Sequence, residues 1–256
     1  MQAPARSAAP AFAPCAVIPV YNHERAVGKV LDAVRAAGLP CVMVDDASWP
    51  ECARELDRLA AADTEVSLVR LPVNLGKGGA VMAGLRAAHE RGFTHALQID
   101  ADGQHAMKDI TRFIAEGQAH PEALVCGRPV FDQAMPRGRF YGRYLTHVFV
   151  WLNTLSFDIP DSMCGFRVYP LGPVLQLLDS SRLGSRMDFD VEVLVRLHWR
   201  GQPMRWLDTR VSYPLDGVSH FRMVWDNVLM VRLQIRLLFG MLIRLPLLLW
   251  RKVGRT

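Results

Sequence analysis

Apolar stretches of strand length alternate with amphipathic stretches over the first half of the chain. The strand-length stretches are almost continuously apolar. In the amphipathic stretches an apolar residue recurs every three or four positions, the spacing of one helical face. The pattern predicts strands near 16–21, 41–45, 65–70, 94–100 and 122–126. It predicts helices near 24–37, 51–61, 78–91 and 107–119. This alternation favours an α/β domain, a mostly parallel sheet with helices on both faces.

The region after residue 128 predicts a loop followed by a helix. Residues 129–138 contain two prolines and a glycine, and residues 138–156 carry apolar side chains at helical spacing. Arg139 and Arg143 lie four positions apart, on one face of that helix. Like charges so placed repel each other unless an anion lies between them, so the helix is a candidate phosphate site. Its aromatic residues indicate ordinary core packing.

The segment 228–250 is strongly apolar but is interrupted by three arginines and a proline. Because an arginine at the centre of a bilayer costs about 2.5–3.5 kcal/mol on insertion scales, a membrane-spanning helix is disfavoured. The pattern favours a helix lying in a membrane interface. The apolar residues that would face away from the arginines are Leu229, Leu233, Leu237, Leu238 and Met241. The alternative is a helix that packs on its own domain or on a second copy of the chain, which leaves a homo-oligomer open.

The positive charge of the chain is local. Thirty Lys and Arg residues stand against 25 Asp and Glu, a formal net charge of +5. Residues 222–256 hold seven basic residues and one acidic residue, which accounts for the whole excess. No nucleic-acid partner is therefore expected. The expected organisation is a flexible tail at 1–14, one domain at 15–221 and a basic apolar helical segment at 222–256.

Cysteine usage and the start of the chain indicate a compartment. The five cysteines are odd in number and have no C-x-x-C spacing, which argues against a zinc site and a disulfide framework. A reducing cytosol fits them best. The first 14 residues are rich in alanine and proline and lack the apolar core of a signal peptide. With the basic apolar segment, this predicts a cytoplasmic protein held peripherally on the inner face of a membrane.

Two carboxylates and an amide follow directly on the apolar strand near 94–100. Asp100, Asp102 and Gln104 lie in one short run, where Gly103 allows the turn that aims them at a common ligand. Mg²⁺ and Mn²⁺ favour such oxygen ligands, and a substrate diphosphate commonly completes their shell. The run therefore predicts a site for Mg²⁺ or Mn²⁺. Taken alone, it fits a solvated Asp-Gly turn equally well.

Other strand ends also carry polar side chains. Tyr21 and Asn22 follow the first strand, Asp45 and Asp46 end the second, and Lys77 lies in a glycine-rich turn that opens a helix. The carboxyl ends of parallel strands meet at one edge of a sheet, which is the usual ligand crevice of open α/β folds. These side chains are therefore expected to converge there.

Five short segments occur in an order that resembles the family 2 glycosyltransferases. They are Ile18–Asn22, Val44–Ser48, Asn74–Gly78, Asp100–His105 and Cys164–Tyr169. Each is weak alone, but five in order over residues 15–215 are a specific signal. The chain is most similar to the polyprenyl-phosphate branch, the dolichol-phosphate mannose synthase-like enzymes. The resemblance implies a GT-A fold, with a Rossmann-like nucleotide-binding half. It also implies inverting, metal-dependent transfer of a sugar from a nucleoside-diphosphate sugar to a lipid-linked or other apolar acceptor.

The resemblance also implies which residues hold the donor. The nucleotide-sugar-binding positions are Pro19, Tyr21, Asn22, Asp46, Lys77, Asp100, Ala101 and Asp102. Asp102 and Gln104 are the implied metal ligands, and the cation would neutralise the departing nucleoside diphosphate. The family commonly has a glutamate where this chain has His23, which leaves the base open. Structural roles are alternatives: a helix cap for Asp46 and a solvated helix start for Lys77.

The expected acceptor site depends on the acceptor. A lipid phosphate is already ionised and needs no strong base, and the implied phosphate-binding residues are Arg128, Arg139, Arg143 and Arg167. A hydroxyl acceptor needs a general base, for which Asp190 and Glu192 are the candidates. The candidate catalytic residues are thus Asp102, Asp190, Glu192, Arg139 and Arg143. The acids at 190 and 192 also suit the first turn of a helix, whose dipole favours negative charge.

Other activities fit the residues less well. His220 stands where the family has a lysine near the product phosphate, which counts against a phosphate acceptor. Ser219 beside it does not indicate a hydrolase, since no nucleophile elbow surrounds it. A nucleotidyltransferase would carry a basic, glycine-rich loop after the first strand, and residues 19–23 are not such a loop. A non-catalytic nucleotide-sugar sensor or partner subunit remains an alternative that a turnover assay decides.

Overall fold

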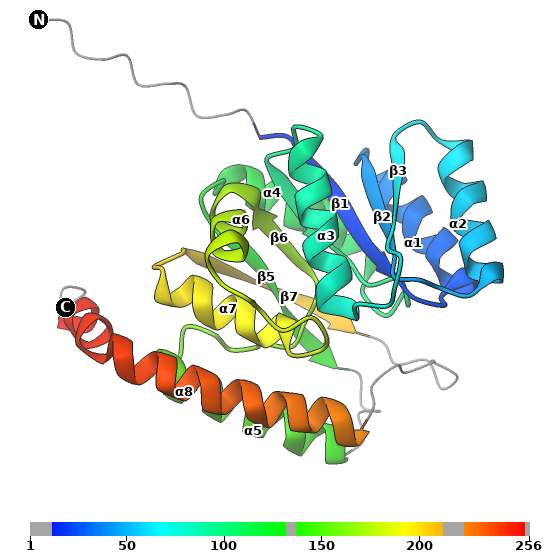
Figure 1. The fold of residues 1–256 in the computed structure, drawn as a ribbon. Coiled ribbons are helices and arrows are strands. Elements are labelled where there is room, and N and C mark those ends of the chain that lie inside the picture. The colour runs from blue at the N-terminus through cyan, green and yellow to red at the C-terminus, as the bar shows by residue number, and fades with distance from the viewer. Residues whose placement is uncertain (1–11, 132–136, 212–222, 254–256) are drawn as a thin grey trace, which may run out of the picture.

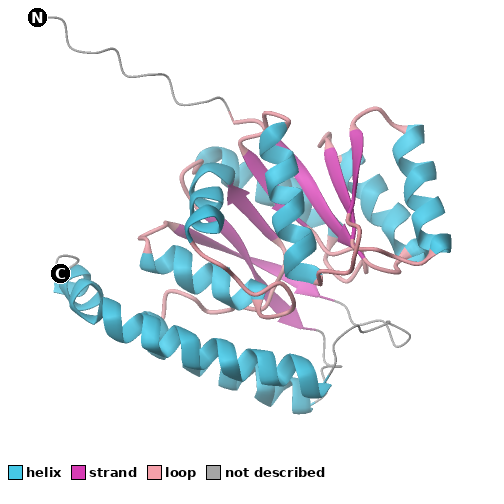
Figure 2. Cartoon of the chain, in the orientation of Figure 1, coloured by secondary structure: helices cyan, strands magenta, loops and turns pink. Residues whose placement is uncertain are grey.

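The computed structural model describes residues 12–131, 137–211 and 223–253, with the backbone alone described at 137–141, 223–224 and 252–253. A seven-stranded sheet runs through these ranges with helices packed on both of its faces (Figures 1 and 2). Residues 1–11 of the expected N-terminal tail lie outside the described ranges, as do Ser219 and His220.

The strand order of the sheet is β3-β2-β1-β4-β6-β5-β7. The strands are β1 (Pro14–Val20), β2 (Cys41–Asp45), β3 (Val66–Arg70), β4 (His95–Gln98), β5 (Leu124–Phe131), β6 (Arg167–Pro170) and β7 (Met204–Val211). Only β6 runs antiparallel to its neighbours, β4 and β5. All other pairings are parallel, so six strands end at the same edge of the sheet. The first five strands confirm the sequence pattern, whereas β6 and β7 lie beyond the region in which it predicted strands.

The central strands are buried on both faces. Val17 belongs to the apolar cluster on one side of the sheet and Ile18 to the cluster on the other, and Val44 and Met43 divide in the same way. Consecutive side chains of a strand point to opposite faces, so a strand covered on both sides must be apolar at every position. This is why these strands read as continuous apolar runs.

Helices form the two outer layers (Figures 1 and 2). On one face of the sheet lie α1 (Glu24–Ala36), α2 (Pro50–Ala62) and α4 (Ile110–Ala119), which follows a short 3₁₀ turn at Met107–Asp109. On the other face lie α3 (Lys77–Glu90), α6 (Leu171–Ser180) and α7 (Phe189–Trp199). The long α8 (Met223–Val253) and α5 (Arg137–Thr154) pack against each other and against α7. The four helices predicted in the first half correspond to α1 to α4.

The C-terminal helix has two apolar stripes. The sequence pattern places Leu233, Leu237 and Met241 on its membrane side, and that interpretation is wrong: all three are buried in the core cluster shared with α7. The error arises because the helix is apolar on a second side as well. That exposed stripe consists of Val228, Val231, Ile235, Phe239, Leu242 and Ile243.

Arginines of α8 tie this helix to α7. Arg251 donates to the backbone carbonyl of Trp199 at 2.8 Å, and the Arg244 guanidinium lies 4.8 Å from the centre of the Trp199 ring. Arg236 pairs with the buried carboxylate of Glu192. These arginines therefore dock α8 on α7, which accounts for the presence of charged residues in an otherwise apolar helix. None of the described helices has the length and uninterrupted apolar character needed to cross a bilayer.

Candidate active site

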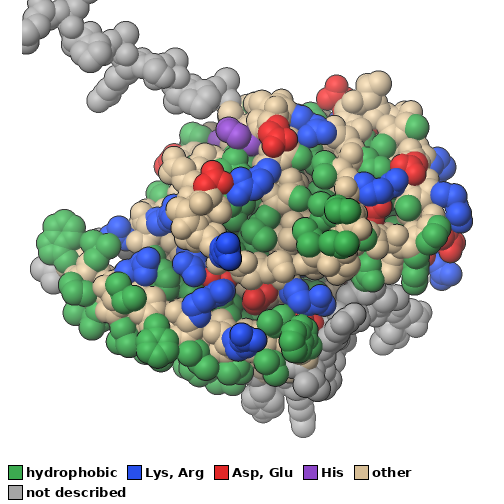
Figure 3. Space-filling view, in the orientation of Figure 1, with side chains coloured by type: hydrophobic (Ala, Val, Ile, Leu, Met, Phe, Trp, Pro, Cys, Tyr) green, Lys and Arg blue, Asp and Glu red, His purple; other side chains and the backbone are tan. Residues whose placement is uncertain are grey.

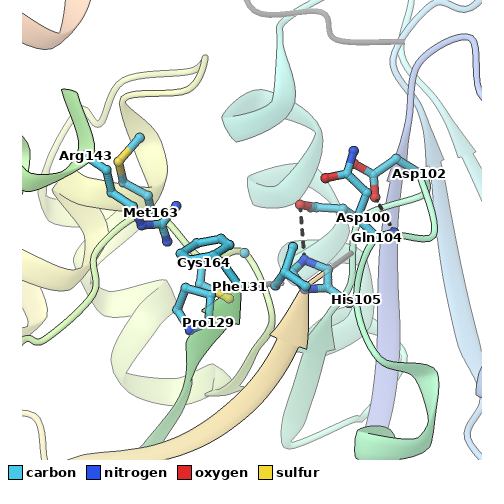
Figure 4. A pocket seen from close by; sticks show the side chains of 11 residues that line it. Asp100, Asp102, Gln104, His105, Pro129, Phe131, Arg143, Met163 and Cys164 are labelled. Carbon is cyan, nitrogen blue, oxygen red and sulfur yellow. Dashed lines mark hydrogen bonds and ion pairs between the residues drawn. The ribbon is translucent and has the colours of Figure 1, made fainter. Parts of the chain in front are cut away.

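A polar pocket lies at the carboxyl edge of the sheet. It is lined by Asp100, Asp102, Gln104, His105, Pro129, Phe131, Arg143, Met163, Cys164, Gly165 and Val211. The first four follow β4, whereas Arg143 comes from α5 and the next three from the loop before β6. Figure 4 shows Arg143 across the pocket from Asp100 and Asp102. The pocket thus has an acidic wall and a basic wall.

A buried ion-pair cluster lies behind the acidic wall. Lys77 Nζ is 2.8 Å from Asp100 Oδ2 and 3.0 Å from Asp190 Oδ2. Burial alone would lower the pKa of Lys77, but the two carboxylates outweigh it and hold this pKa well above its usual value. Burial alone would raise the pKa of Asp100, but Lys77 holds it far below its usual range. Lys77 and Asp100 are therefore both charged at neutral pH.

Three side chains from β4 and β6 complete this cluster. Gln98 donates from Nε2 to Asp190 Oδ1 at 3.4 Å, and its Oε1 accepts from the Tyr169 hydroxyl at 3.1 Å. Arg167 donates to the backbone carbonyl of Asp190 at 2.9 Å and to the Tyr169 hydroxyl at 3.2 Å. With only 1% of its surface exposed, Arg167 supports Asp190 from behind and does not line the pocket as a phosphate ligand.

His105 approaches the same carboxylate from the other side. Its Nε2 lies 3.5 Å from Asp100 Oδ2, and its ring stacks on Phe166 with a centroid distance of 5.2 Å. Two groups thus meet at Asp100 Oδ2, the ammonium of Lys77 and the imidazole of His105. Asp100 Oδ1, by contrast, is buried and has no hydrogen-bond partner among the described residues.

Asp102 forms no salt bridge with any described lysine or arginine. Its Oδ1 accepts the backbone N–H of Gln104 at 3.0 Å. Burial and the charge of Asp100 raise its pKa, because a second negative charge close by is unfavourable. A divalent cation would relieve this repulsion and satisfy the orphan Asp100 oxygen, so the residues present fit Mg²⁺ or Mn²⁺.

The protein alone offers only part of a metal shell. Within the described ranges there is no group of three or more His, Cys, Asp or Glu side chains that could hold a metal ion. The predicted ligands Asp102 and Gln104 line the pocket together with Asp100. This set matches the sites in which substrate phosphates complete the coordination of Mg²⁺.

Asp46 holds the glycine-rich turn before α3. Its Oδ1 accepts the N–H of Leu75 at 2.7 Å, and its Oδ2 accepts that of Gly76 at 2.9 Å. Gly76 has a φ of +86°, which favours glycine, and a Cβ there would lie 2.8 Å from the carbonyl oxygen of Ser185. The N–H of Gly79 donates to that same carbonyl at 2.8 Å. The described contacts thus give Asp46 a structural role, and its contact with a nucleotide stays a prediction.

The loop after β1 is tied to the loop after β2. Asn22 has a φ of +57°, its Oδ1 accepts the N–H of Trp49 at 2.9 Å, and its own N–H donates to Ser48 Oγ at 3.1 Å. Tyr21, which precedes Asn22 in the chain, is half-buried. Three of the predicted donor-binding residues are buried: Pro19 within β1, Asp46 after β2 and Ala101 after β4.

Arg143 is the arginine among the described residues that lines the pocket. Its Nε and Nη2 lie 2.7 and 2.5 Å from Asp161 Oδ2, and its guanidinium lies 5.0 Å from the centre of the Phe131 ring. Nη1 forms no hydrogen bond with the described residues. The group is thus fixed on two sides and keeps donors for a bound anion.

Two other predicted phosphate ligands do not join it in the described structure. Pro129 and Phe131 face the pocket, so Arg128, next to Pro129 in the same strand, points to the opposite face of β5. There it is exposed and pairs with Asp208 at 2.5 Å. The side chain of Arg139 lies outside the described part of the chain, so its pairing with Arg143 stays a prediction.

Neither predicted base lines the pocket. Glu192 is fully buried, accepting from the N–H of Gly184 at 2.8 Å and from Arg196 Nε at 2.6 Å, and it also pairs with Arg236. Its carboxylate thus fastens α7 to α8. Asp190 is held by Lys77 in the buried cluster.

Sequence reasoning assigned no role to Gln98, Asp161 or Gly165. Gln98 carries a signal, since it is a polar residue inside an apolar strand. Asp161 carries none, because its partner Arg143 lies 18 positions away. At Gly165 a Cβ would lie 2.7 Å from Lys77 Nζ and 3.0 Å from Asp100 Oδ1, so a larger residue there would have to displace the buried ion pair.

A mostly parallel sheet with this acidic turn after β4 is the arrangement of one class of fold, the GT-A glycosyltransferases. The family described as glycosyl transferase family 2 matches residues 15–174. Since this is more than half of the chain, the protein belongs to glycosyl transferase family 2. The resemblance seen in the sequence is thereby confirmed.

Similar proteins include enzymes named for lipid phosphates. Undecaprenyl-phosphate mannosyltransferase of Micrococcus luteus is 27% identical over 192 residues, which cover 70% of this chain and 75% of that protein. Dolichyl-phosphate beta-glucosyltransferase of Drosophila melanogaster is 29% identical over 202 residues, which cover 70% of this chain and 60% of the fly protein. This chain therefore spans three fifths of the fly enzyme's length.

Solved structures share the fold at lower identity. The structure of S. aureus TarS 1-349 in complex with UDP-GlcNAc has a TM-score of 0.59 at 14% identity and covers 88% of this chain and 66% of that one. The mannosyltransferase PcManGT from Pyrobaculum calidifontis in complex with GDP-Man and Mn²⁺ has a TM-score of 0.54 at 16% identity, covering 82% and 60%. The expected GT-A fold is thus confirmed.

Proposed function

We propose that this glycosyltransferase moves a sugar from a nucleoside-diphosphate sugar onto the phosphate of a polyprenyl phosphate. The observation that carries the proposal is the placement of Arg143 across one pocket from Asp100 and Asp102. An acidic wall suits a metal-bound diphosphate, and a fixed arginine suits a second anion. The relatives named for undecaprenyl and dolichyl phosphate support the same acceptor class.

The state of the two candidate bases also supports a phosphate acceptor. A hydroxyl must lose its proton as it attacks, whereas a phosphate oxygen is already an anion. Glu192 is buried between Arg196 and Arg236, and Asp190 is bound to Lys77. Either acid would have to leave its partners to act as a base. Transfer to a phosphate needs no such change.

In the proposed reaction an oxygen of the acceptor phosphate bonds to the anomeric carbon of the sugar. The bond from that carbon to the donor diphosphate breaks at the same time, and the nucleoside diphosphate leaves with the electron pair. A single displacement of this kind inverts the anomeric configuration. Asp102 and Gln104 would hold Mg²⁺ or Mn²⁺, whose charge would stabilise the leaving diphosphate.

An exposed apolar face on α5 and α8 suits a membrane-bound acceptor. On α5 it comprises Tyr144, Leu145, Val148, Phe149 and Leu152, and on α8 Val228, Val231, Ile235, Phe239, Leu242, Ile243, Leu247, Leu249 and Trp250. Figure 3 shows hydrophobic side chains gathered along α8 with basic side chains beside them. Exposed apolar side chains gathered in this way mark an interaction surface. We propose that it rests on the cytoplasmic face of a membrane, where α5 brings Arg143 close to the lipid phosphate.

Kinetics of matched variants test the acceptor class. Arg143→Ala, alone or with Arg139→Ala, should lower kcat/KM for a polyprenyl phosphate. The loss of transition-state stabilisation should be about 1.5–3 kcal/mol for each charge-assisted hydrogen bond that the variant removes. Glu192→Gln should leave turnover per folded molecule within a few fold. A hydroxyl acceptor predicts the reverse order, with Glu192→Gln or Asp190→Asn slower by about 10²–10⁴-fold and the arginine variants near normal.

A further inference from the structure

The carboxylate of Asp161 joins two parts of the pocket wall that are distant in sequence. Its Oδ2 binds Arg143 of α5 at 2.7 Å. Its Oδ1 accepts the backbone N–H groups of Met163 at 3.0 Å and Cys164 at 2.8 Å. Arg143, Met163 and Cys164 all line the pocket, whereas Asp161 does not. One buried side chain therefore sets the position of a helix arginine relative to the loop that faces it.

Asp161 is ionised in the folded protein. Burial alone would raise its pKa, but the neighbouring imidazole of His147 and the charge of Arg143 lower it to about 2. His147 Nε2 lies 3.3 Å from the same oxygen that binds Arg143. Only 3% of Asp161 is exposed, so solvent does not compete for these contacts. The carboxylate is thus a permanent acceptor for the guanidinium.

The contact leaves one edge of the Arg143 guanidinium for a ligand. A guanidinium has five N–H donors in a fixed plane, and Asp161 engages Nε and Nη2. The ring of Phe131 lies against the flat face of the group. Rotation is therefore restricted on both sides, and Nη1 has no hydrogen-bond partner within the described ranges.

We propose that Asp161 is a positioning residue for the acceptor phosphate, acting through Arg143 and the Met163–Gly165 loop. This inference rests on the proposed transfer to a polyprenyl phosphate. Asp161 fixes the direction of the arginine donors and sets the loop, including Gly165, against the metal side of the pocket. Asp161 does not line the pocket and binds Arg143 directly, so its loss should affect acceptor binding more than donor binding.

An opposing electrostatic effect makes the inference testable. A carboxylate near the acceptor site repels a phosphate, so if its charge were the dominant effect, removing it would tighten acceptor binding. If positioning dominates, removing it weakens binding, since an asparagine side chain at this position would offer one acceptor oxygen where two are now used. The sign of the change in acceptor KM therefore separates the two roles.

The experiment compares Asp161→Asn with wild type using a short-chain polyprenyl phosphate and Mn²⁺. Acceptor KM should rise about tenfold or more, a loss of about 1.4 kcal/mol, while donor KM stays within about twofold. Asp161→Glu keeps the charge, and its acceptor KM should lie between those of wild type and Asp161→Asn. It replaces Asp161→Asn if that variant folds poorly. Asp158→Asn, in the same loop but half-exposed and paired with His198, is the control and should match wild type.

A double variant tests whether Asp161 acts through the arginine. Arg143→Ala with Asp161→Asn should raise acceptor KM little more than Arg143→Ala alone, because the arginine that Asp161 directs at the acceptor is then absent. Additive losses, or an unchanged or lowered acceptor KM in Asp161→Asn, would overturn the inference and leave the proposed function standing. Absence of transfer to polyprenyl phosphate by wild type would overturn both.

Discussion

The ammonium of Lys77 and the carboxylate of Asp100 lie 2.8 Å apart, although one residue begins α3 and the other follows β4. The pair fastens the glycine-rich turn to the acidic turn that lines the pocket. Asp190 shares the same ammonium at 3.0 Å, which brings the start of α7 into the cluster. Three segments of the carboxyl edge are thus held by one cation.

Replacing Lys77 should lower the free energy of unfolding more than removing an exposed ion pair does. Lys77→Met leaves Asp100 and Asp190 buried without their cation, and breaking a buried pair in this way costs about 3–5 kcal/mol. Arg86→Ala is the matched control, since it removes an exposed pair with Asp179 from the same helix and should cost about 0–1 kcal/mol. Urea denaturation measures both. Equal losses would contradict the central role of Lys77.

A methyl group at Gly165 should disturb the Lys77–Asp100 ion pair by crowding it. Its Cβ would lie 2.7 Å from Lys77 Nζ and 2.9 Å from Gln98 Nε2. We expect Gly165→Ala to cost about 1–3 kcal/mol of stability through overpacking and to lower transfer at temperatures where the variant is folded. At Gly172, in α6, a Cβ meets nothing within 4 Å. Gly172→Ala should therefore keep full activity, and activity of Gly165→Ala equal to that of the control would refute the close approach.

Removing the charge of Asp102 should weaken nucleotide binding only when metal is present. Asp102→Asn should retain wild-type stability without ligands, or gain slightly, because the charge repulsion with Asp100 is gone. With Mn²⁺ and the correct nucleoside diphosphate, wild type should gain about 2.7 kcal/mol at a concentration 100 times Kd, and the variant should gain much less. Thermal shift with and without Mn²⁺ reads both quantities. An equal gain in the two proteins would remove Asp102 from the metal site.

The exposed stripe of α8 should be required for membrane binding but not for folding. Phe239 and Ile243 are 63% and 80% exposed. Changing both to Ser should weaken binding to anionic vesicles about tenfold or more, since burying each side chain contributes about 1.5–3 kcal/mol. The free energy of unfolding should change by only about 0.5 kcal/mol.

Trp49→Ser with Val73→Ser removes two half-exposed apolar side chains elsewhere and is the control for this experiment. It should leave vesicle binding unchanged. If the α8 variant binds vesicles as wild type does but changes from oligomer to monomer, a second copy of the chain covers the stripe instead.

Local patterns in the sequence predicted the first half of the fold and the acidic wall, because both depend on neighbours along the chain. Strands covered on both faces are apolar runs, and Asp100, Asp102 and Gln104 share one turn. The basic wall depended on distant contacts. Arg128 and Arg143 look alike in sequence, yet the phase of β5 turns Arg128 away, while Asp161 holds Arg143 at the pocket.

The C-terminal helix shows a second limit of pattern reading. A helix with two apolar stripes has no single amphipathic face, so its sequence does not reveal which stripe packs inside. Leu237 on one stripe is buried, whereas Phe239, two positions further and therefore on nearly the opposite side of the helix, is exposed. Partners on α5 and α7 decide this, and they become visible only in three dimensions.

The most direct test of a phosphate acceptor compares transfer to a polyprenyl phosphate with transfer to the polyprenol of the same chain length. The full chain would be incubated with Mn²⁺, each acceptor and a panel of nucleoside-diphosphate sugars, and the lipid products identified by mass spectrometry. We expect a sugar-phosphate-lipid product from one donor, none from the polyprenol, and loss of that product in Arg143→Ala. Glycosylation of the polyprenol, or product from the phosphate that does not depend on Arg143, would contradict this expectation.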